Sequence, residues 1–309
     1  MAYPHIFAGN PLDRGETERR DEEWISSKAR DKGSRFLPLR DLNVLITEES
    51  QVQLGWVGVE ELEQVSNDLS PMFLGMQEGA TYFAVDVTAH PDGAAGLESG
   101  EGRRFEESRS AAEQLSGPDA AILAQARSQL NWHKSHQFCS ACGHRSDVGR
   151  GGQVRICPNC QVHHFPRTDP VVITVVVDVE NDRCLLGQSR GRLARMRRYS
   201  ALAGFMDQGE AIEEAVAREV MEEAGIQVKN VRYHSSQPWP FPSSLMIGCL
   251  AEAATTDIHM DEVEMTDVQW FDRSEVLLAL EEKSEKLMIP GPIAIAHHLI
   301  KAWALGESG

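Results

Sequence analysis

The second half of the chain alternates between strand-like and helix-like hydrophobic patterns. Residues 170–179 (PVVITVVVDV) are β-branched almost throughout, which is typical of a strand buried on both faces. Asn181 and Asp182 mark a turn after this strand. Further strands are predicted over 183–188, 228–235, 245–253 and 269–271. Apolar residues recur at helical spacing over 210–224 and 293–305, so the order of elements predicts an α/β domain.

The first half of the chain shows weaker patterns and no chemical motif. Strand-like alternation is found over 36–47, 52–57 and 81–87. The polar residues 1–32 are predicted to be irregular or peripheral, and the Gly-rich, acidic stretch 93–102 is predicted to be a loop. A helix is predicted over 118–132. We interpret 1–115 as a separate α/β domain with a scaffold or dimerisation role, and 116–135 as a linker helix.

Composition and charge narrow the class of protein. Lys and Arg number 30 against 47 Asp and Glu among 309 residues, so the net charge is −17. Such a charge disfavours non-specific binding to nucleic acid or anionic membranes, and a phosphate substrate would need metal ions or a local basic patch. The chain has no apolar run as long as a membrane span, and its first residues lack a signal pattern. We therefore expect a cytoplasmic protein.

Four of the six cysteines form two CxxC pairs separated by fourteen residues: Cys139, Cys142, Cys157 and Cys160. This spacing predicts a zinc ribbon over 136–166, in a reducing compartment. Four thiolates leave no open position on zinc, so the ion should be structural. A redox dithiol and a nucleic-acid-binding ribbon are the alternatives. The nearby histidines are interpreted as surface or supporting residues rather than ligands: His133, His136, His144, His163 and His164.

Residues 204–226 (GFMDQGEAIEEAVAREVMEEAGI) carry the strongest candidate chemistry. On a helix Glu219, Glu222 and Glu223 stand at i, i+3 and i+4, so their carboxylates converge beside an apolar stripe. Crowded carboxylates need a compensating cation, and oxygen ligands without histidine suit Mg²⁺ or Mn²⁺. Arg218 lies one turn before Glu222 and can orient it. The alternative is a solvated acidic helix with one Arg–Glu pair.

Two further segments flank this helix. Five arginines occur within nine residues at Arg190, Arg192, Arg195, Arg197 and Arg198. They indicate either a solvated loop or a contact with phosphate or RNA near the catalytic mouth.

Residues 236–244 (SQPWPFPSS) hold three prolines that fix an extended loop and present Trp239 and Phe241. These rings could stack on a base, or the loop could be a stiff connector with core aromatics.

These motifs resemble those of a known family. Residues 204–226 match the Nudix box G-x5-E-x7-R-E-U-x-E-E-x-G-U, where U is apolar. The SQPWPFPSS loop, the four-cysteine ribbon and Phe165-Pro166-Arg167 resemble the NADH pyrophosphatase branch of the Nudix hydrolases. The resemblance implies an α/β/α Nudix sandwich over 167–309, a homodimer with composite pockets, and a divergent N-terminal domain. It also implies hydrolysis of NAD(H) to nicotinamide mononucleotide and AMP, and NAD-cap removal from RNA 5′ ends.

The resemblance further implies a set of site residues. The Mg²⁺ or Mn²⁺ ligands would be Glu219, Glu222, Glu223, Glu264 and the backbone carbonyl of Ala203. The substrate-binding residues would be Phe165, Gln237, Pro238, Trp239, Pro240, Phe241, Pro242, Ser243, Ser244 and Ala296. Gly151 and Gly152 stand where some members place a glutamate that reaches the substrate.

The resulting hypothesis is metal-assisted phosphoryl transfer to water, in which Glu222, Glu223 or Glu264 takes the proton. One alternative is a different Nudix pyrophosphatase, acting on ADP-ribose or dinucleoside polyphosphates. The other is a non-catalytic, zinc-ribbon nucleic-acid-binding protein with a decayed Nudix domain, which the intact glutamates oppose.

Overall fold

The computed structural model of the chain describes residues 5–307. The chain divides into two compact units: unit 1 holds residues up to 167 together with 239–243, and unit 2 holds 168–238 and the residues from 244 onward. Residues 1–4 and 308–309 lie outside the described residues. The prediction about targeting signals concerns these ends in part. Within 5–307, no helix combines the length and the apolar character needed to cross a membrane.

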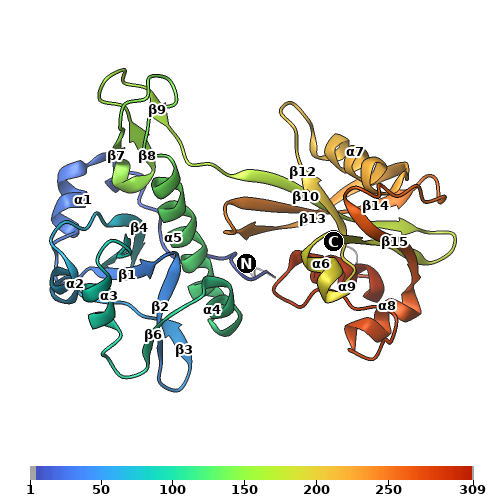
Figure 1. Ribbon diagram of the computed structural model, residues 1–309, viewed down its shortest axis with the longest axis horizontal. Helices are drawn as coiled ribbons and strands as arrows, with labels where there is room; N and C mark the ends of the chain where they lie inside the picture. The colour runs from blue at the N-terminus through green and yellow to red at the C-terminus, as the bar shows by residue number, and fades with distance from the viewer. Residues whose placement is uncertain (1–4, 308–309) are drawn as a thin grey trace. The chain divides into compact units, whose positions relative to one another are not determined.

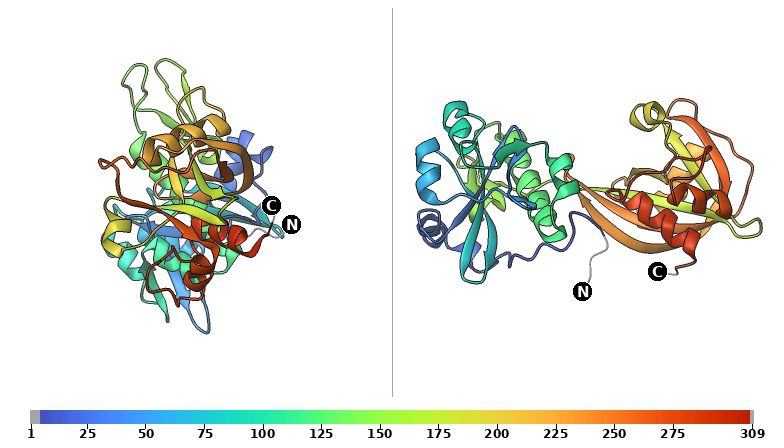
Figure 2. Two further views of the ribbon diagram at one scale, coloured as in Figure 1. Left: turned by 90° about the vertical axis from the view of Figure 1, so that its right-hand side faces the viewer. Right: turned by 90° about the horizontal axis from the view of Figure 1, so that it is seen from below.

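Unit 2 is built on a mixed sheet of six strands: β10 (Asp169–Asp178), β11 (Arg183–Ser189), β12 (Leu202–Phe205), β13 (Val228–Trp239), β14 (Ser244–Ala253) and β15 (Met265–Asp272). The order is β13-β14-β10-β11-β15, with β12 on β10. The central pair β10–β14 is parallel, and β11 is antiparallel to both β10 and β15. The long β13–β14 pair is clearest in Figure 2. β13 continues to Trp239, so a strand occupies the first part of the predicted loop 236–244.

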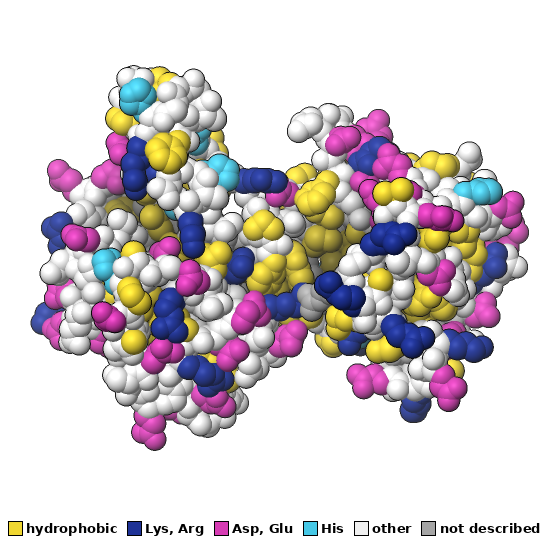
Figure 3. Space-filling model, viewed as in Figure 1, with side chains coloured by type: hydrophobic (Ala, Val, Ile, Leu, Met, Phe, Trp, Pro, Cys, Tyr) yellow, Lys and Arg dark blue, Asp and Glu magenta, His cyan; other side chains and the backbone are white. Residues whose placement is uncertain are grey.

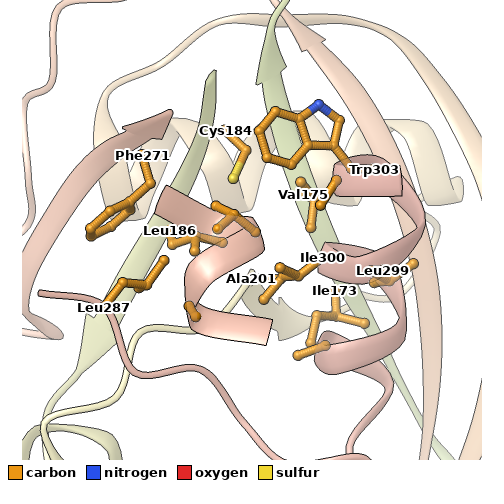
Figure 4. Close-up of a cluster of buried hydrophobic side chains, with 14 of the residues drawn as sticks. Ile173, Val175, Cys184, Leu186, Ala201, Phe271, Leu287, Leu299, Ile300 and Trp303 are labelled. Atoms are coloured by element: carbon orange, nitrogen blue, oxygen red, sulfur yellow. The ribbon is translucent and has the colours of Figure 1, made fainter. Parts of the chain in front are cut away.

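The alternation of side chains along β10 creates two cores, one on each face of the sheet. Val172 and Val176 point to the face covered by α7 (Ile212–Ala224). Ile173 and Val175 point to the opposite face, covered by α9 (Ile295–Leu305), as Figure 4 shows. Each fully buried Val or Ile stabilises the fold by about 1.5–3 kcal/mol. The predicted α/β/α sandwich is therefore confirmed.

Two shorter helices complete unit 2: α6 (Arg192–Met196) and α8 (Arg273–Leu280). Figure 1 shows them with α9 around the same sheet. The predicted helices 210–224 and 293–305 each begin two residues later than expected, at Ile212 and Ile295, and end as predicted. The sequence patterns did not indicate α8.

Unit 1 contains a second mixed sheet: β1 (Arg35–Arg40), β2 (Asn43–Glu48), β3 (Val52–Leu54), β4 (Met72–Gln77), β5 (Ala80–Asp86) and β6 (Arg103–Glu106). The order is β3-β2-β1-β5-β4, with β6 on β2. As in unit 2, the pair at the centre, β1–β5, is parallel and joins strands that are not consecutive in the chain. Phe36, Phe73 and Phe83 lie in its core with no exposed surface.

Five helices of unit 1 were not indicated by the sequence patterns: η1 (Glu18–Arg20), α1 (Glu22–Lys28), α2 (Val59–Val65), α3 (Pro91–Leu97) and α4 (Ser108–Gln114). The predicted helix 118–132 is found as α5 (Gly117–Ser135). The prediction that 1–32 is irregular or peripheral is wrong for η1 and α1, which are regular helices. Asp21 caps α1 by accepting from the N–H of Trp24, and buried Arg19 donates to the carbonyls of Phe73 and Leu74. The predicted loop 93–102 is also wrong, because its first part forms α3.

Candidate active site

The helix α7 carries Glu219, Glu222 and Glu223, and local interactions fix both of its ends. The side chain of Glu214 accepts a 2.7 Å hydrogen bond from the N–H of Ala211, as in a capping box. Gly225 ends the helix in the left-handed conformation, with φ at 69°, and donates to the carbonyl of Met221. Glu210 stays outside the helix because its carboxylate accepts from the N–H of Asp207 and from Arg218.

Arg218 gathers three of the carboxylates around one guanidinium group. It donates to both oxygens of Glu210, at 2.6 and 2.8 Å, to Glu219 at 2.8 Å, and to Glu222 at 2.9 Å. A further hydrogen bond, from Arg218 to the carbonyl of Phe205, fixes the guanidinium against the loop before the helix. These bonds lower the pKa of Glu210 to about 2. The sequence analysis did not include Glu210 among the site residues, although its position as the first glutamate of the Nudix box could have indicated it.

Glu223 is the buried member of the group, with only 6% of its surface exposed. One of its carboxylate oxygens, Oε2, is buried without a hydrogen-bond partner. Burial, reinforced by the negative charge of Glu219, raises the pKa of Glu223 to about 8, and the backbone of Ala203 opposes this change. Burial also raises the pKa of Glu219. The cluster therefore holds a carboxylate that lacks a compensating positive charge.

The structure places Glu264 and Ala203 beside this cluster. The charge of Glu264 contributes to the raised pKa values of both Glu219 and Glu223. The N–H of Asp261 donates to the carbonyl of Glu223 at 3.3 Å, which ties the segment before β15 to the end of α7. Ala203 lies on β12, paired with Ile173 of β10. Ala203 and the four predicted glutamate ligands thus lie near one another in unit 2, but the carboxylate oxygens do not converge as closely as the four cysteine sulfurs of the ribbon do.

These residues fit a hard divalent cation. Glu219, Glu222, Glu223 and Glu264 offer only oxygen atoms, which Mg²⁺ and Mn²⁺ prefer. The unpartnered Oε2 of Glu223 and the mutual repulsion of the carboxylates indicate a missing positive charge. The predicted convergence is only partial, because Arg218 holds Glu219 and Glu222, and the side chain of Glu222 is 56% exposed.

The raised pKa of Glu223 predicts a pH-dependent stability of the protein without Mg²⁺ or Mn²⁺. Because the folded pKa of about 8 exceeds the usual 4.5, this group contributes stability that is complete below pH 4.5 and is lost as pH rises through 8. We expect the free-energy difference between Glu223→Gln and wild type to grow by about 3–5 kcal/mol from pH 4.5 to pH 9. Thermal unfolding of zinc-loaded protein across this range measures it. Glu222→Gln is the control, and parallel curves for wild type and Glu223→Gln would contradict the assignment.

The predicted substrate loop packs within unit 1 through its aromatic residues. The rings of Trp239 and Phe241 meet Phe7 edge to face, with centroids 5.9 and 5.8 Å away. The guanidinium of Arg109 lies 5.1 Å from the Trp239 ring, and that of Arg127 lies 4.5 Å from the Phe241 ring. These are the contacts expected of a stiff connector with core aromatics, and base stacking by the loop stays a prediction.

The other predicted substrate residues are divided between the two units. In unit 2, Gln237 is fully buried, and its amide donates to the carbonyl of Ile293 and accepts from the N–H of Ile295 at 2.8 Å each. Gln237 therefore seats the beginning of α9, in which Ala296 is buried in the core. Pro238 and Ser244 belong to β13 and β14 of the same unit, whereas Pro240, Pro242 and Ser243 belong to unit 1. In unit 1, Phe165 is 66% exposed.

The zinc ribbon holds its four cysteines in the turns beside three short strands: β7 (Asp147–Gly149), β8 (Val154–Ile156) and β9 (His163–His164). The sulfurs of Cys139, Cys142, Cys157 and Cys160 all lie within 4.8 Å of one another, the only group of three or more potential metal ligands this close among residues 5–307. Matching turns position them, since Gly143 donates to the carbonyl of Cys139 and Gln161 to that of Cys157. Four converging thiol groups fit a structural zinc ion.

His133 connects α5 to the ribbon and is not among the four converging ligands. Its Nε2 lies 2.8 Å from the carbonyl of Gly152, and its Nδ1 lies 3.1 Å from the guanidinium of Arg155. Burial lowers the pKa of His133 to about 4, so the ring is neutral near pH 7. Gly151 and Gly152 form part of η2 (Arg150–Gly152) at this junction, packed beneath the ribbon.

Cys157→Ser is expected to act on folding rather than on chemistry. Cys157 is fully buried, and losing one of four thiolates weakens zinc binding, which is coupled to local folding. We expect zinc content to fall from about one ion per chain to a small fraction of that, with a lower melting temperature. Cys249→Ser, at a buried cysteine of unit 2, should keep its zinc. A Cys157→Ser protein with full zinc and wild-type stability would refute the structural role.

Comparison with known proteins accounts for nearly the whole chain. Residues 33–132 match the NADH pyrophosphatase-like rudimentary NUDIX domain, 134–165 the NADH pyrophosphatase zinc ribbon domain, and 168–290 the NUDIX domain. The NAD-capped RNA hydrolase NUDT12 of Macaca fascicularis is 36% identical over 97% of this chain and 73% of its own length.

Two further relatives extend this picture. The NAD-capped RNA hydrolase of Schizosaccharomyces pombe is 32% identical over 99% of this chain and 94% of its own. The mitochondrial NAD(P)H pyrophosphatase NUDT13 of Mus musculus is 42% identical over 67% of this chain and 61% of its own. With the complete box on α7 and four converging cysteines, the chain belongs to the Nudix hydrolases, in the branch of the NADH pyrophosphatases and NAD-cap RNA hydrolases.

Proposed function

We propose that this protein hydrolyses the pyrophosphate bond of NAD(H) to nicotinamide mononucleotide and AMP, and that it removes the NAD cap from RNA 5′ ends. The observation that carries the proposal is the buried Glu223, whose Oε2 lacks a partner among three other carboxylates on and beside the box helix. The named activities of the relatives supply the substrate class.

The proposed mechanism assigns the box residues to charge and proton handling. Glu219, Glu222, Glu223, Glu264 and the carbonyl of Ala203 would hold Mg²⁺ or Mn²⁺. When bound, such an ion neutralises pyrophosphate oxygens and acidifies a water molecule. Arg218 keeps Glu219 and Glu222 oriented through its fixed guanidinium. The Oε2 of Glu223 needs positive charge, so it would bind the cation or take the proton that water releases.

Substrate recognition in this proposal uses the residues that the family resemblance implies. The exposed ring of Phe165 and the aromatic loop 239–241 would contact the dinucleotide, and a homodimer with composite pockets would bring the remaining residues to it. A cytoplasmic location and the homodimer stay predictions from the sequence.

The test is incubation of zinc-loaded protein with NADH and Mg²⁺ or Mn²⁺, with products separated by chromatography. We expect reduced nicotinamide mononucleotide and AMP in equal amounts, and none when Mg²⁺ and Mn²⁺ are left out. Rates on NADH, NAD⁺, ADP-ribose and NAD-capped RNA then rank the substrates. Faster hydrolysis of ADP-ribose would favour a different Nudix pyrophosphatase. Binding of RNA without metal-dependent hydrolysis of any of them would favour a non-catalytic protein.

A further inference from the structure

The arginines between 190 and 198 form a distinct surface segment of unit 2, here named the arginine segment. It follows β11, contains the short helix α6, and returns to the sheet through Ser200, whose N–H donates to the carbonyl of Gly187 at 2.8 Å. Figure 3 shows basic side chains on the surface of this unit around α6. Arg195 and Arg197 are exposed, and Arg198 is half-buried.

Hydrogen bonds join the arginine segment to Glu264, the residue directly before β15. The N–H of Arg190 donates to the carbonyl of Glu264 at 2.8 Å, and the Nε of Arg190 donates to the carbonyl of Glu262 at 3.0 Å. At the other end, the N–H of Tyr199 donates to the carbonyl of Met288 at 2.8 Å. The segment therefore begins beside one of the proposed metal ligands and is held in place by backbone hydrogen bonds at both ends.

Two arginines of this segment, Arg195 and Arg197, carry charges that no carboxylate pairs within the described part of the chain. Arg183, Arg218 and Arg273 of the same unit each form an ion pair with a carboxylate. Among residues 5–307, by contrast, Arg195 and Arg197 form no ion pair or side-chain hydrogen bond. In Arg198, the Nε is buried without a hydrogen-bond partner. In a chain of net charge −17, several arginines without carboxylates at one place indicate a binding surface for an anion.

We propose that the arginine segment binds phosphates of the RNA chain that follows an NAD cap. This inference rests on the proposed function, in which the cap pyrophosphate lies at the carboxylate cluster. Guanidinium groups bind phosphate oxygens in pairs and stay charged at any physiological pH. The described part of the segment exposes no aromatic ring for base stacking, so the contact would be with the backbone and independent of sequence. Free NADH ends at its own two phosphates and gains nothing from this surface.

The test compares the double variant Arg195→Ala/Arg197→Ala with Lys229→Ala/Arg232→Ala. The control pair removes two exposed basic side chains from β13 of the same unit, so the net charge changes equally. For the arginine-segment variant we expect kcat/KM on NAD-capped RNA to fall about tenfold or more in low salt, while kcat/KM on NADH stays within about twofold. The dependence of log KM for RNA on log salt should lose a slope of about 1.4 for the two lost phosphate contacts.

Binding of an uncapped single-stranded RNA oligonucleotide, followed by fluorescence anisotropy, separates this inference from the proposed function. Weaker binding by the arginine-segment variant alone supports the inference whether or not the protein hydrolyses NADH. Equal losses in both double variants would reduce the effect to net charge and overturn it. Unchanged binding and unchanged kcat/KM on capped RNA would also overturn it, while metal-dependent hydrolysis of NADH would leave the proposed function standing. Equal losses on NADH and capped RNA would point to the active site instead.

Discussion

Glu223→Gln is expected to lower turnover of NADH by a factor on the order of 10² or more. Gln keeps the volume of the side chain but removes the negative charge from the one buried carboxylate of the cluster. The cluster would then bind Mg²⁺ or Mn²⁺ more weakly, and no carboxylate would stand at that position to accept a proton. Steady-state kinetics on NADH over a range of metal concentrations measure the effect.

The thermal stability of Glu223→Gln shows whether a loss of activity comes from unfolding or from the missing carboxylate. Near neutral pH, wild type without metal must take up a proton on Glu223 when it folds, and glutamine avoids this cost, so an inactive Glu223→Gln should melt above metal-free wild type. Glu222→Gln, at the more exposed carboxylate, should lose less activity. Wild-type kinetics for Glu223→Gln at saturating metal would remove Glu223 from the mechanism.

The box helix could be predicted from sequence because its signals are local. The spacing of Glu219, Glu222 and Glu223, the apolar stripe and Gly225 as a stop all lie within one short segment. The same holds for the zinc ribbon, where two CxxC turns define a site on their own. The full set of partners of Arg218 was harder to predict from sequence. Arg218 binds Glu222 on the helix, as expected, but it also binds Glu210 in the loop before the helix.

The errors occurred where a segment depends on distant partners. Four glycines and two glutamates made 93–102 look like a loop, but Gly93 lies in α3, where a Cβ would come within 2.7 Å of the backbone of Val65 in α2. Here glycine permits close packing of two helices rather than flexibility. The role of Trp239 and Phe241 was left open for the same reason, because their packing partners Phe7, Arg109 and Arg127 lie more than a hundred residues away in the chain.

Gly204→Ala is expected to lower kcat/KM on NADH by a factor on the order of 10², comparable to loss of a metal ligand. Gly204 pairs with Val172 on the central sheet, and a Cβ built there would lie 2.0 Å from the carboxylate carbon of Glu219. No side chain tolerates such a distance, so either Glu219 moves away from the cluster or β12 shifts. Glu219 would leave its 2.8 Å bond to Arg218, and the other carboxylates would lose their shared orientation. Kinetics and metal titration of the folded variant measure this.

The control for this substitution is Gly117→Ala, at the first position of α5, where a Cβ would meet nothing within 4 Å. It should leave activity and stability nearly unchanged. The strain in Gly204→Ala should also cost about 1–3 kcal/mol of folding free energy, as overpacking does, so activity is compared below the melting temperature of the variant. If Gly204→Ala then keeps wild-type kcat/KM and metal affinity, the position of Glu219 does not govern the reaction. Metal binding would then rest on Glu223 and Glu264, since Glu222 is held outward by Arg218.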